Sequence, residues 1–248
     1  MSKTILITGA SRGIGRAAAV LAGERGWSVG VNYRSDPAAA DSVVAAVECA
    51  GGRAVAIGGD VAEEADVIAM FQATEDAFGP LGGVVINAGI AASSMPLAEM
   101  SAERLKRLFE VNILGSFLCA REAARRMSKS RGGQGGSVVI VSSVSARLGS
   151  PFEFIDYAAS KGAMDTLALG LARELGREGV RVNAIRPGLT DTEIHATAGQ
   201  PDRASRLGET TPIGRAARPE EIAEPIIWLL SDAASYTSGA ILDVSGGR

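Results

Sequence analysis

The segment Thr8-Gly9-Ala10-Ser11-Arg12-Gly13-Ile14-Gly15 follows a short apolar run from Thr4 to Ile7 and precedes an alanine-rich stretch of helical length. Its glycines let the backbone turn tightly and approach a pyrophosphate, and the start of the following helix offers unpaired N–H groups to that anion. The spacing departs from the common Gly-x-Gly-x-x-Gly pattern, because Gly13 lies four positions after Gly9 and two before Gly15. The segment predicts a strand, a phosphate-binding turn and a helix.

The same alternation of short β-branched runs and helical stretches continues along the chain. Strands are predicted at Thr4 to Ile7, Ser28 to Asn32, Ala54 to Gly58, Gly83 to Ile86, Ser137 to Val141, Arg181 to Ile185 and Ala240 to Val244. Helices are predicted at Ile14 to Arg25, Ala38 to Ala50, Glu63 to Phe78, Ala102 to Lys129, Tyr157 to Glu178 and Pro219 to Leu230. This order predicts an α/β, doubly wound Rossmann-type fold with a mostly parallel seven-stranded sheet and helices on both faces.

Length and composition indicate one globular domain. The chain has 248 residues, of which 46% are hydrophobic and 21% charged, and no Pro- or Ser-rich linker divides it, so we expect a single dinucleotide-binding domain over residues 1–248. Ser130 to Gly136 is predicted to be a flexible surface turn. Thr190 to Pro212 lacks clear periodicity and is either a substrate loop that acts as a lid or a disordered surface loop.

Charge and cysteine content exclude several classes of protein. The net charge of −3 argues against a nucleic-acid binder, and no apolar run is long enough for a membrane helix. Without a leader-like N-terminus, and with Cys49 and Cys119 each in an apolar stretch, we expect buried thiols and a cytoplasmic location. Cysteines and histidines do not cluster, and His195 is the single histidine, so no metal site is expected.

Polar residues follow the later strands at positions suited to a dinucleotide. The second strand ends in Tyr33-Arg34, with no acidic residue for a ribose 2′-OH, whereas Arg34 together with Arg12 could hold a 2′-phosphate. This favours NADP over NAD; the alternative is that both are solvated surface arginines. Asp60-Val61 and Asn87-Ala88-Gly89 lie at carboxyl ends of strands, where open α/β sheets bind ligands, although Asp60 alone would also suit a helix N-cap.

A second set of residues has the chemistry of an acid–base catalyst. Tyr157 and Lys161 lie four residues apart and share a helix face, so the ammonium is expected to lower the pKa of the phenol toward the working range. Ser142-Ser143, at the end of the fifth strand, supplies a hydroxyl for a carbonyl or alcohol oxygen.

These motifs together resemble the short-chain dehydrogenase/reductase family over essentially the whole chain. The resemblance rests on Thr8-Gly9-x-x-x-Gly13-x-Gly15, Asp60, Asn87-Ala88-Gly89, Asn112, Ser143, Tyr157-x-x-x-Lys161, Pro187-Gly188 and the segment Ser238-Gly239 to Gly246-Gly247. It implies that Tyr157 transfers the proton, Lys161 holds the nicotinamide ribose, Ser143 orients the substrate oxygen, and Asn112 supports a water-linked proton relay. It also implies a cofactor-binding set of Gly9, Ser11, Arg12, Gly13, Ile14, Gly15, Tyr33, Arg34, Asp60, Val61, Asn87, Ala88, Gly89, Tyr157, Lys161, Pro187, Gly188, Thr190 and Thr192.

One spacing departs from the family pattern. Fourteen positions separate Ser143 from Tyr157, one more than is usual, so either the segment from Arg147 to Asp156 carries an insertion or the register is shifted. Ser142 and Ser145 are therefore alternatives to Ser143.

The resemblance implies an NADP(H)-dependent oxidoreductase, with NAD(H) as a possible alternative, that moves a hydride between nicotinamide and a carbonyl or secondary alcohol. The closest subgroups are the 3-oxoacyl-acyl-carrier-protein reductases and the glucose 1-dehydrogenase-like enzymes. An acyl-carrier partner would use the basic residues Arg121, Arg125, Arg126, Lys129 and Arg131, whereas a sugar would use Glu153, Asp156 and His195; His195 alone is expected to be an exposed loop residue. Epimerisation or dehydration through a keto intermediate and a non-catalytic sensor are alternatives, and a homotetramer is implied.

Overall fold

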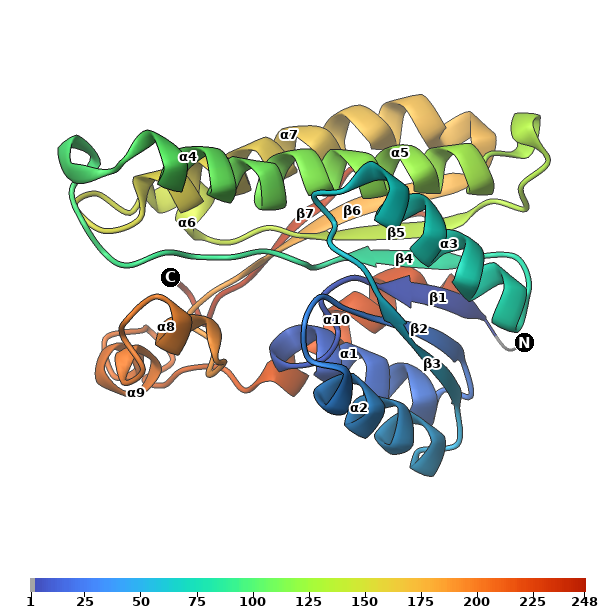
Figure 1. Cartoon of the computed structure of the whole chain (residues 1–248), viewed down its shortest axis with the longest axis horizontal. Helices are drawn as coiled ribbons and strands as arrows, with labels where there is room; N and C mark the ends of the chain where they lie inside the picture. Colours follow the sequence, from blue (N-terminus) through green and yellow to red (C-terminus); the bar gives the residue numbers. More distant parts are fainter. Residues whose placement is uncertain (1–2) are drawn as a thin grey trace.

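The computed structural model describes residues 3–248, and a seven-stranded sheet forms its centre (Figure 1). All neighbouring strands pair in parallel, in the order β3-β2-β1-β4-β5-β6-β7. The strands are β1 Thr4–Ile7, β2 Ser28–Tyr33, β3 Arg53–Gly58, β4 Gly83–Ile86, β5 Gly136–Val141, β6 Val180–Pro187 and β7 Ile241–Val244. The predicted α/β doubly wound fold and all seven strands are confirmed, within one or two residues at each end.

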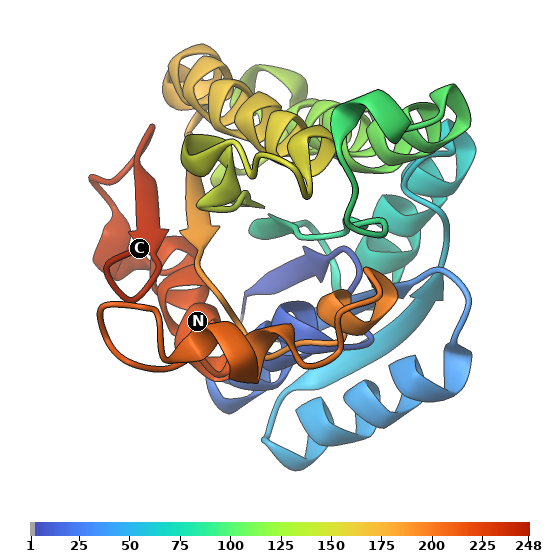
Figure 2. The ribbon, with the colours of Figure 1, turned by 90° about the vertical axis from the view of Figure 1, so that its left-hand side faces the viewer.

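Helices cover both faces of this sheet (Figure 2). One face carries α1 Gly13–Glu24, α2 Pro37–Cys49 and α10 Pro219–Leu230, and the other carries α3 Glu64–Phe78, α4 Ala102–Phe109, α5 Gly115–Met127 and α7 Ile155–Leu175. Three short helices, α6 Ser145–Leu148, α8 Ile194–Thr197 and α9 Arg203–Gly208, lie beyond the carboxyl ends of the strands. No helix in this described part of the chain is long and apolar enough to cross a membrane.

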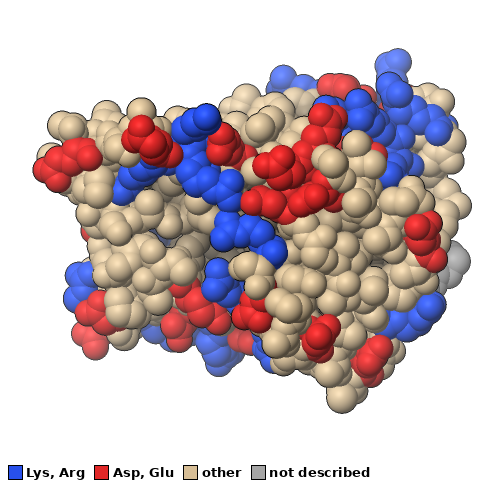
Figure 3. Space-filling model, in the orientation of Figure 1, with Lys and Arg blue, Asp and Glu red and all other residues tan. Residues whose placement is uncertain are grey.

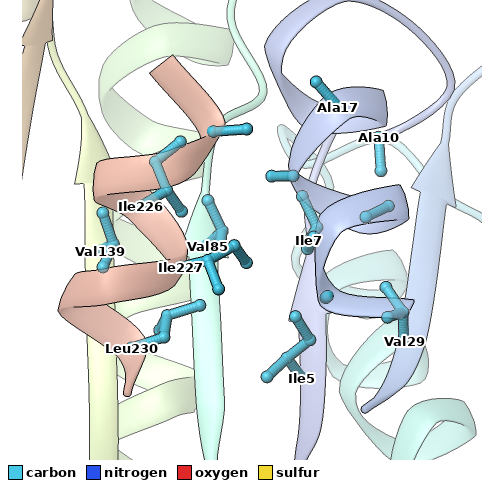
Figure 4. Close-up of a cluster of buried hydrophobic side chains, with 14 of the residues drawn as sticks. Ile5, Ile7, Ala10, Ala17, Val29, Val85, Val139, Ile226, Ile227 and Leu230 are labelled. Carbon is cyan, nitrogen blue, oxygen red and sulfur yellow. The ribbon is translucent and has the colours of Figure 1, made fainter. Parts of the chain in front are cut away.

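Alternating strand residues divide the interior into two cores. Ile5 and Ile7 of β1 face α1 and α10, where they pack with Ile226 (Figure 4), whereas Leu6 between them faces α3 and α5. Side chains on a strand alternate in direction, so a strand covered on both faces must be apolar throughout. This is why the predicted strands read as continuous β-branched runs.

The predicted helix from Ala102 to Lys129 is wrong in detail. A π-helical turn, Glu110–Leu114, separates α4 from α5, and α5 ends at Met127. The extra residue in that turn directs the Asn112 carboxamide onto the backbone of Ile90, which it binds through both N–H and C=O.

Two further expectations need correction. The segment Thr190 to Pro212 is not structureless, because α8 and α9 form within it.

Cys49 is exposed, whereas Cys119 is buried as expected, with burial raising the pKa of its thiol to about 12. The buried stripe of α2 runs through Ala40, Val43 and Val47, and Cys49 lies off that stripe.

The topology fixes where a ligand can bind. The strand order reverses between β1 and β4, so the chain leaves these two neighbouring strands toward opposite faces of the sheet. Open α/β sheets bind ligands in the crevice that this divergence leaves at the carboxyl ends. The glycine segment after β1 and the Asn87 segment after β4 meet at this point.

Replacing Ile226 by Ala is expected to lower the free energy of unfolding by about 2–5 kcal/mol, because this fully buried side chain joins α10 to the sheet. Urea denaturation measures the change. The exposed Glu224 on the same helix is the matched control, and Glu224→Ala should change stability by less than about 0.5 kcal/mol. Equal effects of the two substitutions would contradict the packing described for α10.

Candidate active site

A cleft of about 800 Å³ opens at the carboxyl ends of the strands. Its walls contain nearly every residue that the sequence singled out, from elements far apart in the chain. The predicted residues among them are Gly9, Ser11, Arg12, Gly13, Ile14, Tyr33, Arg34, Asp60, Val61, Asn87, Ala88, Gly89, Ser143, Tyr157, Lys161, Pro187, Gly188, Thr190 and Thr192. Gly15 and Asn112 lie outside the lining and act through neighbouring residues.

The glycine turn after β1 is held open by side-chain amides. Gly9 adopts a left-handed conformation, with φ of 61°, and its N–H donates to Asn32 Oδ1 at 3.0 Å. Asn87 Nδ2 donates to the carbonyls of Thr8 and Gly9 at 2.8 and 3.0 Å. A Cβ on Gly9 would lie 3.0 Å from Ala88 Cα, so only glycine allows this approach.

The start of α1 fits an anion. No side chain caps it, and its first turn contains no acidic residue, so its N–H groups and dipole are available to an anion in the cleft. Gly15 allows the helix to approach the turn, since a Cβ there would lie 2.6 Å from the Gly9 carbonyl oxygen. Thr192 lies beside the start of the helix, and its Cγ2 is 3.3 Å from the position that a Cβ on Gly13 would occupy. These features fit the pyrophosphate of a dinucleotide.

Basic and acidic groups surround the end of the cleft beyond β2 and β3. Arg12 and Arg34 line it and are exposed, and Asp60 lies beside them at the end of β3. Burial alone would raise the pKa of Asp60, but hydrogen bonds from the Ala62 N–H and from Arg107 outweigh it, and the net effect lowers that pKa. Asp60 stays ionised and braces the turn before α3 rather than capping the helix itself, whose N-cap is Glu63.

The deepest part of the cleft holds Ser143, Tyr157 and Lys161. The Lys161 ammonium donates to the Val141 carbonyl at 2.8 Å and lies 5.6 Å from the centre of the Tyr157 ring. The Ser143 hydroxyl lies near the Tyr157 phenol and acts to lower its pKa. The structure therefore brings together three of the four predicted catalytic side chains.

Burial dominates the titration of both catalytic groups. It raises the pKa of Tyr157 to about 12, against the opposing hydrogen bond from Ser143, and it lowers the pKa of Lys161 to about 8, with Asp165 acting in the opposite direction. The expected lowering of the Tyr157 pKa is thus absent from this structure. The reason is geometric, because the ammonium binds the Val141 carbonyl rather than the phenol oxygen.

The geometry distinguishes the three candidate serines. Ser142 is buried and donates its hydroxyl to the Lys161 carbonyl at 3.0 Å, so it fixes α7. Ser143 is the serine that interacts with the Tyr157 phenol, and its Oγ accepts a hydrogen bond from the Ser145 N–H at 3.1 Å. The loop after α6, between Ser143 and Tyr157, contains three left-handed residues, Gly149, Ser150 and Phe152.

Asn112 supports the site from outside the cleft. Its carboxamide binds Ile90 on both sides, at 2.8 and 2.9 Å, and donates to Ser160 Oγ at 3.1 Å. Its main-chain carbonyl accepts from Ser116 at 2.8 Å. Lys161 Nζ and Asn112 Oδ1 both lie beside Gly89. Each atom is 3.4 Å from the position that a Cβ on Gly89 would occupy.

Polar side chains of Glu153, His195 and Arg203 contribute to the wall of the cleft, beside apolar residues such as Leu148 and Ile194. Glu153 accepts two hydrogen bonds from Arg203 of α9, at 2.7 and 2.9 Å, and the guanidinium lies 5.1 Å from the Phe154 ring centre. His195 is half-buried rather than exposed, and its Nε2 bonds with the Thr190 carbonyl at 2.8 Å. Asp156 points away from the cleft to an ion pair with Arg104, so its predicted contact with a substrate is wrong.

Sequence reasoning missed Asn32 and Arg203. Asn32 is buried, ends β2, and also donates to the carbonyls of Ile57 and Gly59 at 3.3 and 3.1 Å. A polar residue at the end of an otherwise apolar strand was the available signal. Arg203 carried none, because its partner lies fifty positions away.

Comparison with known proteins identifies the family. A model described as enoyl-(acyl carrier protein) reductase matches residues 9–248. The crystal structure of a short-chain type dehydrogenase/reductase from Mycobacterium marinum matches with a TM-score of 0.92 and 33% identity, covering 99% of this chain and 94% of that one. The chain belongs to the short-chain dehydrogenase/reductase family.

Curated relatives of this short-chain dehydrogenase/reductase cover almost its whole length. An uncharacterized oxidoreductase, YgfF, of Escherichia coli K12 is 47% identical, over 98% of both chains. The L-rhamnose 1-dehydrogenase (NAD(P)(+)) of a Sphingomonas species is 39% identical, over 99% of this chain and 95% of the relative. Glucose 1-dehydrogenase 2 of Bacillus subtilis is 36% identical, over 99% and 94%. The chain is an NAD(P)-dependent short-chain oxidoreductase acting on alcohol or carbonyl substrates, which removes the non-catalytic sensor as an alternative.

Replacing Gly15 by Ala is expected to raise the Kd for NADPH at least about tenfold, or about 1.4 kcal/mol, because the new Cβ would displace the Gly9 carbonyl and the Asn87 amide. Nicotinamide fluorescence on titration measures the Kd. Gly170→Ala in α7 is the control, since its Cβ would meet nothing within 4 Å, and it should leave the Kd unchanged. Unchanged binding by Gly15→Ala would refute the role assigned to the glycine turn.

Proposed function

We propose that the protein is an NADP(H)-preferring dehydrogenase that interconverts a hydroxyl and a carbonyl on a small polar substrate of the sugar class. The observation that carries this proposal is the cluster of Ser143, Tyr157 and Lys161 in a cleft whose lining also includes the polar side chains of Glu153, His195 and Arg203. The related L-rhamnose and glucose 1-dehydrogenases support the substrate class.

The chain's own residues supply proton transfer and orientation. The nicotinamide supplies or accepts the hydride when bound. Ser143 donates a hydrogen bond to the substrate oxygen, and Tyr157 gives that oxygen a proton in reduction or removes it in oxidation. The Lys161 ammonium lies 5.6 Å from the centre of the Tyr157 ring. In the catalytic complex its positive charge would favour the phenolate form of Tyr157, which burial alone opposes. The buried surroundings strengthen each of these interactions by excluding water.

Two arginines and the lack of an acidic partner at the end of β2 support the preference for NADP. Arg34 follows the last residue of β2, and Arg12 stands opposite it in the glycine turn. Neither guanidinium takes part in an ion pair in the described part of the chain. Both are therefore free to bind a 2′-phosphate.

The basic residues at the end of α5 give little support to an acyl-carrier-protein partner. Three of the five pair with carboxylates: Arg121 with Glu64, Arg125 with Glu122, and Arg126 with Glu75 and Glu122. This end of α5 lies at the edge of the sheet opposite the cleft (Figure 1). Basic and acidic side chains are mixed across the face drawn in Figure 3. A small diffusible substrate fits this charge distribution better.

We also propose a homotetramer, in which the outer faces of α5 and α7 contact copies of the chain. Leu114 before α5, Phe117 in α5 and Leu169 in α7 are exposed large apolar residues of these helices. Exposed apolar side chains grouped in this way are typical of protein interfaces.

Purified protein is expected to reduce NADP⁺ with L-rhamnose or glucose, followed at the nicotinamide absorbance. Tyr157→Phe should abolish turnover, and Ser143→Ala should lower kcat by about 10²–10³-fold through loss of the hydrogen bond to the developing oxyanion. Ser142→Ala is the matched control and should retain most activity, because its hydroxyl serves the Lys161 carbonyl. Turnover of an acetoacetyl thioester but of no sugar would refute the substrate class, and activity in Tyr157→Phe would refute the mechanism.

Arg34→Ala is expected to raise KM for NADPH about tenfold or more while leaving KM for NADH within about twofold, since a charge-assisted hydrogen bond contributes about 1.5–3 kcal/mol. The comparison of the two cofactors measures the loss. Arg25→Ala, at the far end of α1, removes an exposed arginine paired with Glu224 and should change neither constant. Equal losses for NADPH and NADH would contradict the role of Arg34 in phosphate binding.

A further inference from the structure

Three ionisable side chains recur every four residues along α7. They are Tyr157, Lys161 and Asp165, and this spacing aligns them on one face of the helix. Lys161 and Asp165 are both buried, at 5% and 7% exposure. Tyr157 and Lys161 belong to the active site, whereas Asp165 has no role in the mechanism described above.

Asp165 is only partly paired. Its Oδ2 accepts from Arg186 Nε at 3.0 Å and Nη2 at 2.8 Å, whereas its Oδ1 is a buried oxygen with no hydrogen-bond partner in the described residues. A buried carboxylate with an unsatisfied oxygen costs folding free energy, which an attractive interaction with a nearby cation offsets in part. Lys161 is the cation one helical turn away.

The other groups that lie beside the Lys161 ammonium in residues 3–248 are neutral. Val141 of β5 accepts its hydrogen bond, and the Asn112 carboxamide of the π-helical turn lies beside Gly89 as the ammonium does. From the elements packed on α7, Arg104 of α4 is neutralised by Asp156, and Arg186 of β6 reaches Asp165. Burial lowers the pKa of Lys161, and Asp165 is the charge that opposes this.

Arg186 divides its charge between two carboxylates. Its Nη1 lies 3.4 Å from Asp243 Oδ1, and Asp243 Oδ2 in turn lies 3.3 Å from Arg147 of α6. Because Arg186 is shared, it screens Asp165 only in part. The negative charge that Lys161 experiences thus depends on Asp165 directly and on Arg186 indirectly.

We propose that Asp165 is a positioning residue for catalysis, whose carboxylate keeps the Lys161 ammonium charged in a buried site while Arg186 limits the strength of that effect. The inference rests on the proposed function, because proton transfer by Tyr157 needs the positive charge of Lys161. Asp165 touches neither substrate nor cofactor and acts only through Lys161.

The direct test is a pH titration of the Lys161 side chain by NMR of protein labelled with ¹³C-lysine. The chain contains only four lysines, Lys3, Lys106, Lys129 and Lys161, and a Lys161→Arg sample assigns the signal. Wild type should titrate near the pKa of about 8. Asp165→Asn should lower the midpoint by about one pH unit, because a negative charge is lost, and Arg186→Gln should raise it, because a positive charge is lost.

Asp243→Asn is the matched control. It removes a carboxylate from the same chain of ion pairs but one arginine further from Lys161, so it should lower the midpoint much less than Asp165→Asn does, through closer pairing of Arg186 with Asp165. Asp165→Asn keeps a side-chain oxygen for Arg186, and circular dichroism verifies its fold. An unchanged midpoint in Asp165→Asn, or an equal shift in Asp243→Asn, would overturn the proposal; should Asp165→Asn not fold, the upward shift in Arg186→Gln decides it.

The pH profile of kcat gives a second readout. The decline of kcat on the alkaline side should move to lower pH in Asp165→Asn and to higher pH in Arg186→Gln, whereas a purely structural role would lower kcat equally at every pH. The NMR titration requires no substrate. Absence of turnover by the wild type on the sugar panel would therefore refute the proposed function, while the midpoints still test Asp165 on their own.

Discussion

The hydrogen bonds of two asparagine carboxamides at the carboxyl ends of β1, β2 and β4 are the interaction on which the site depends. Asn32 and Asn87 reach across from neighbouring strands to the backbone of the glycine turn. Thr8 adds its hydroxyl, which accepts from the N–H groups of Asn87 and Ala88 at 2.9 and 3.0 Å. These bonds fix a turn that by itself would be flexible, so the start of α1 has a defined direction.

Burial then gives the catalytic residues their electrostatic character. The same exclusion of water raises the pKa of Tyr157 and lowers that of Lys161, so both neutral forms are favoured in the protein alone. Charge at this site must be maintained by specific partners rather than by solvent. For Lys161 that partner is Asp165, one turn further along α7, whose charge opposes the effect of burial.

The sequence was sufficient for the parts of the structure that local physics determines. Apolar runs such as Gly83–Ile86 have a single interpretation in a parallel sheet, and Tyr157 and Lys161 had to share a helix face. Contacts between distant segments were not predictable in this way. Ser143 is distinguished from Ser142 by which hydroxyl lies near Tyr157, and the π-helical turn at Asn112 accompanies a tertiary contact with Ile90.

Charge provides the clearest example of the same limit. Asp156 reads in sequence as a polar neighbour of Tyr157, yet its carboxylate turns to Arg104 and leaves the cleft. The arginines at the end of α5 read as a basic patch, although carboxylates on α3 and within α5 itself, Glu64, Glu75 and Glu122, occupy three of them. The order of charged residues in a sequence does not show which oppositely charged side chains the fold brings into contact.

The ion pair between Glu153 and Arg203 has a consequence for how substrate preference can diverge within the family. It joins the loop before α7 to α9, two segments that mutate independently in the gene but share one bidentate contact. Residues in such contact typically show coupling energies of about 0.5–3 kcal/mol, so substitutions at the two positions are epistatic. A segment containing α9 therefore cannot be exchanged between homologues as an independent module. Its residue 203 must match the side chain at position 153, with which it forms the ion pair.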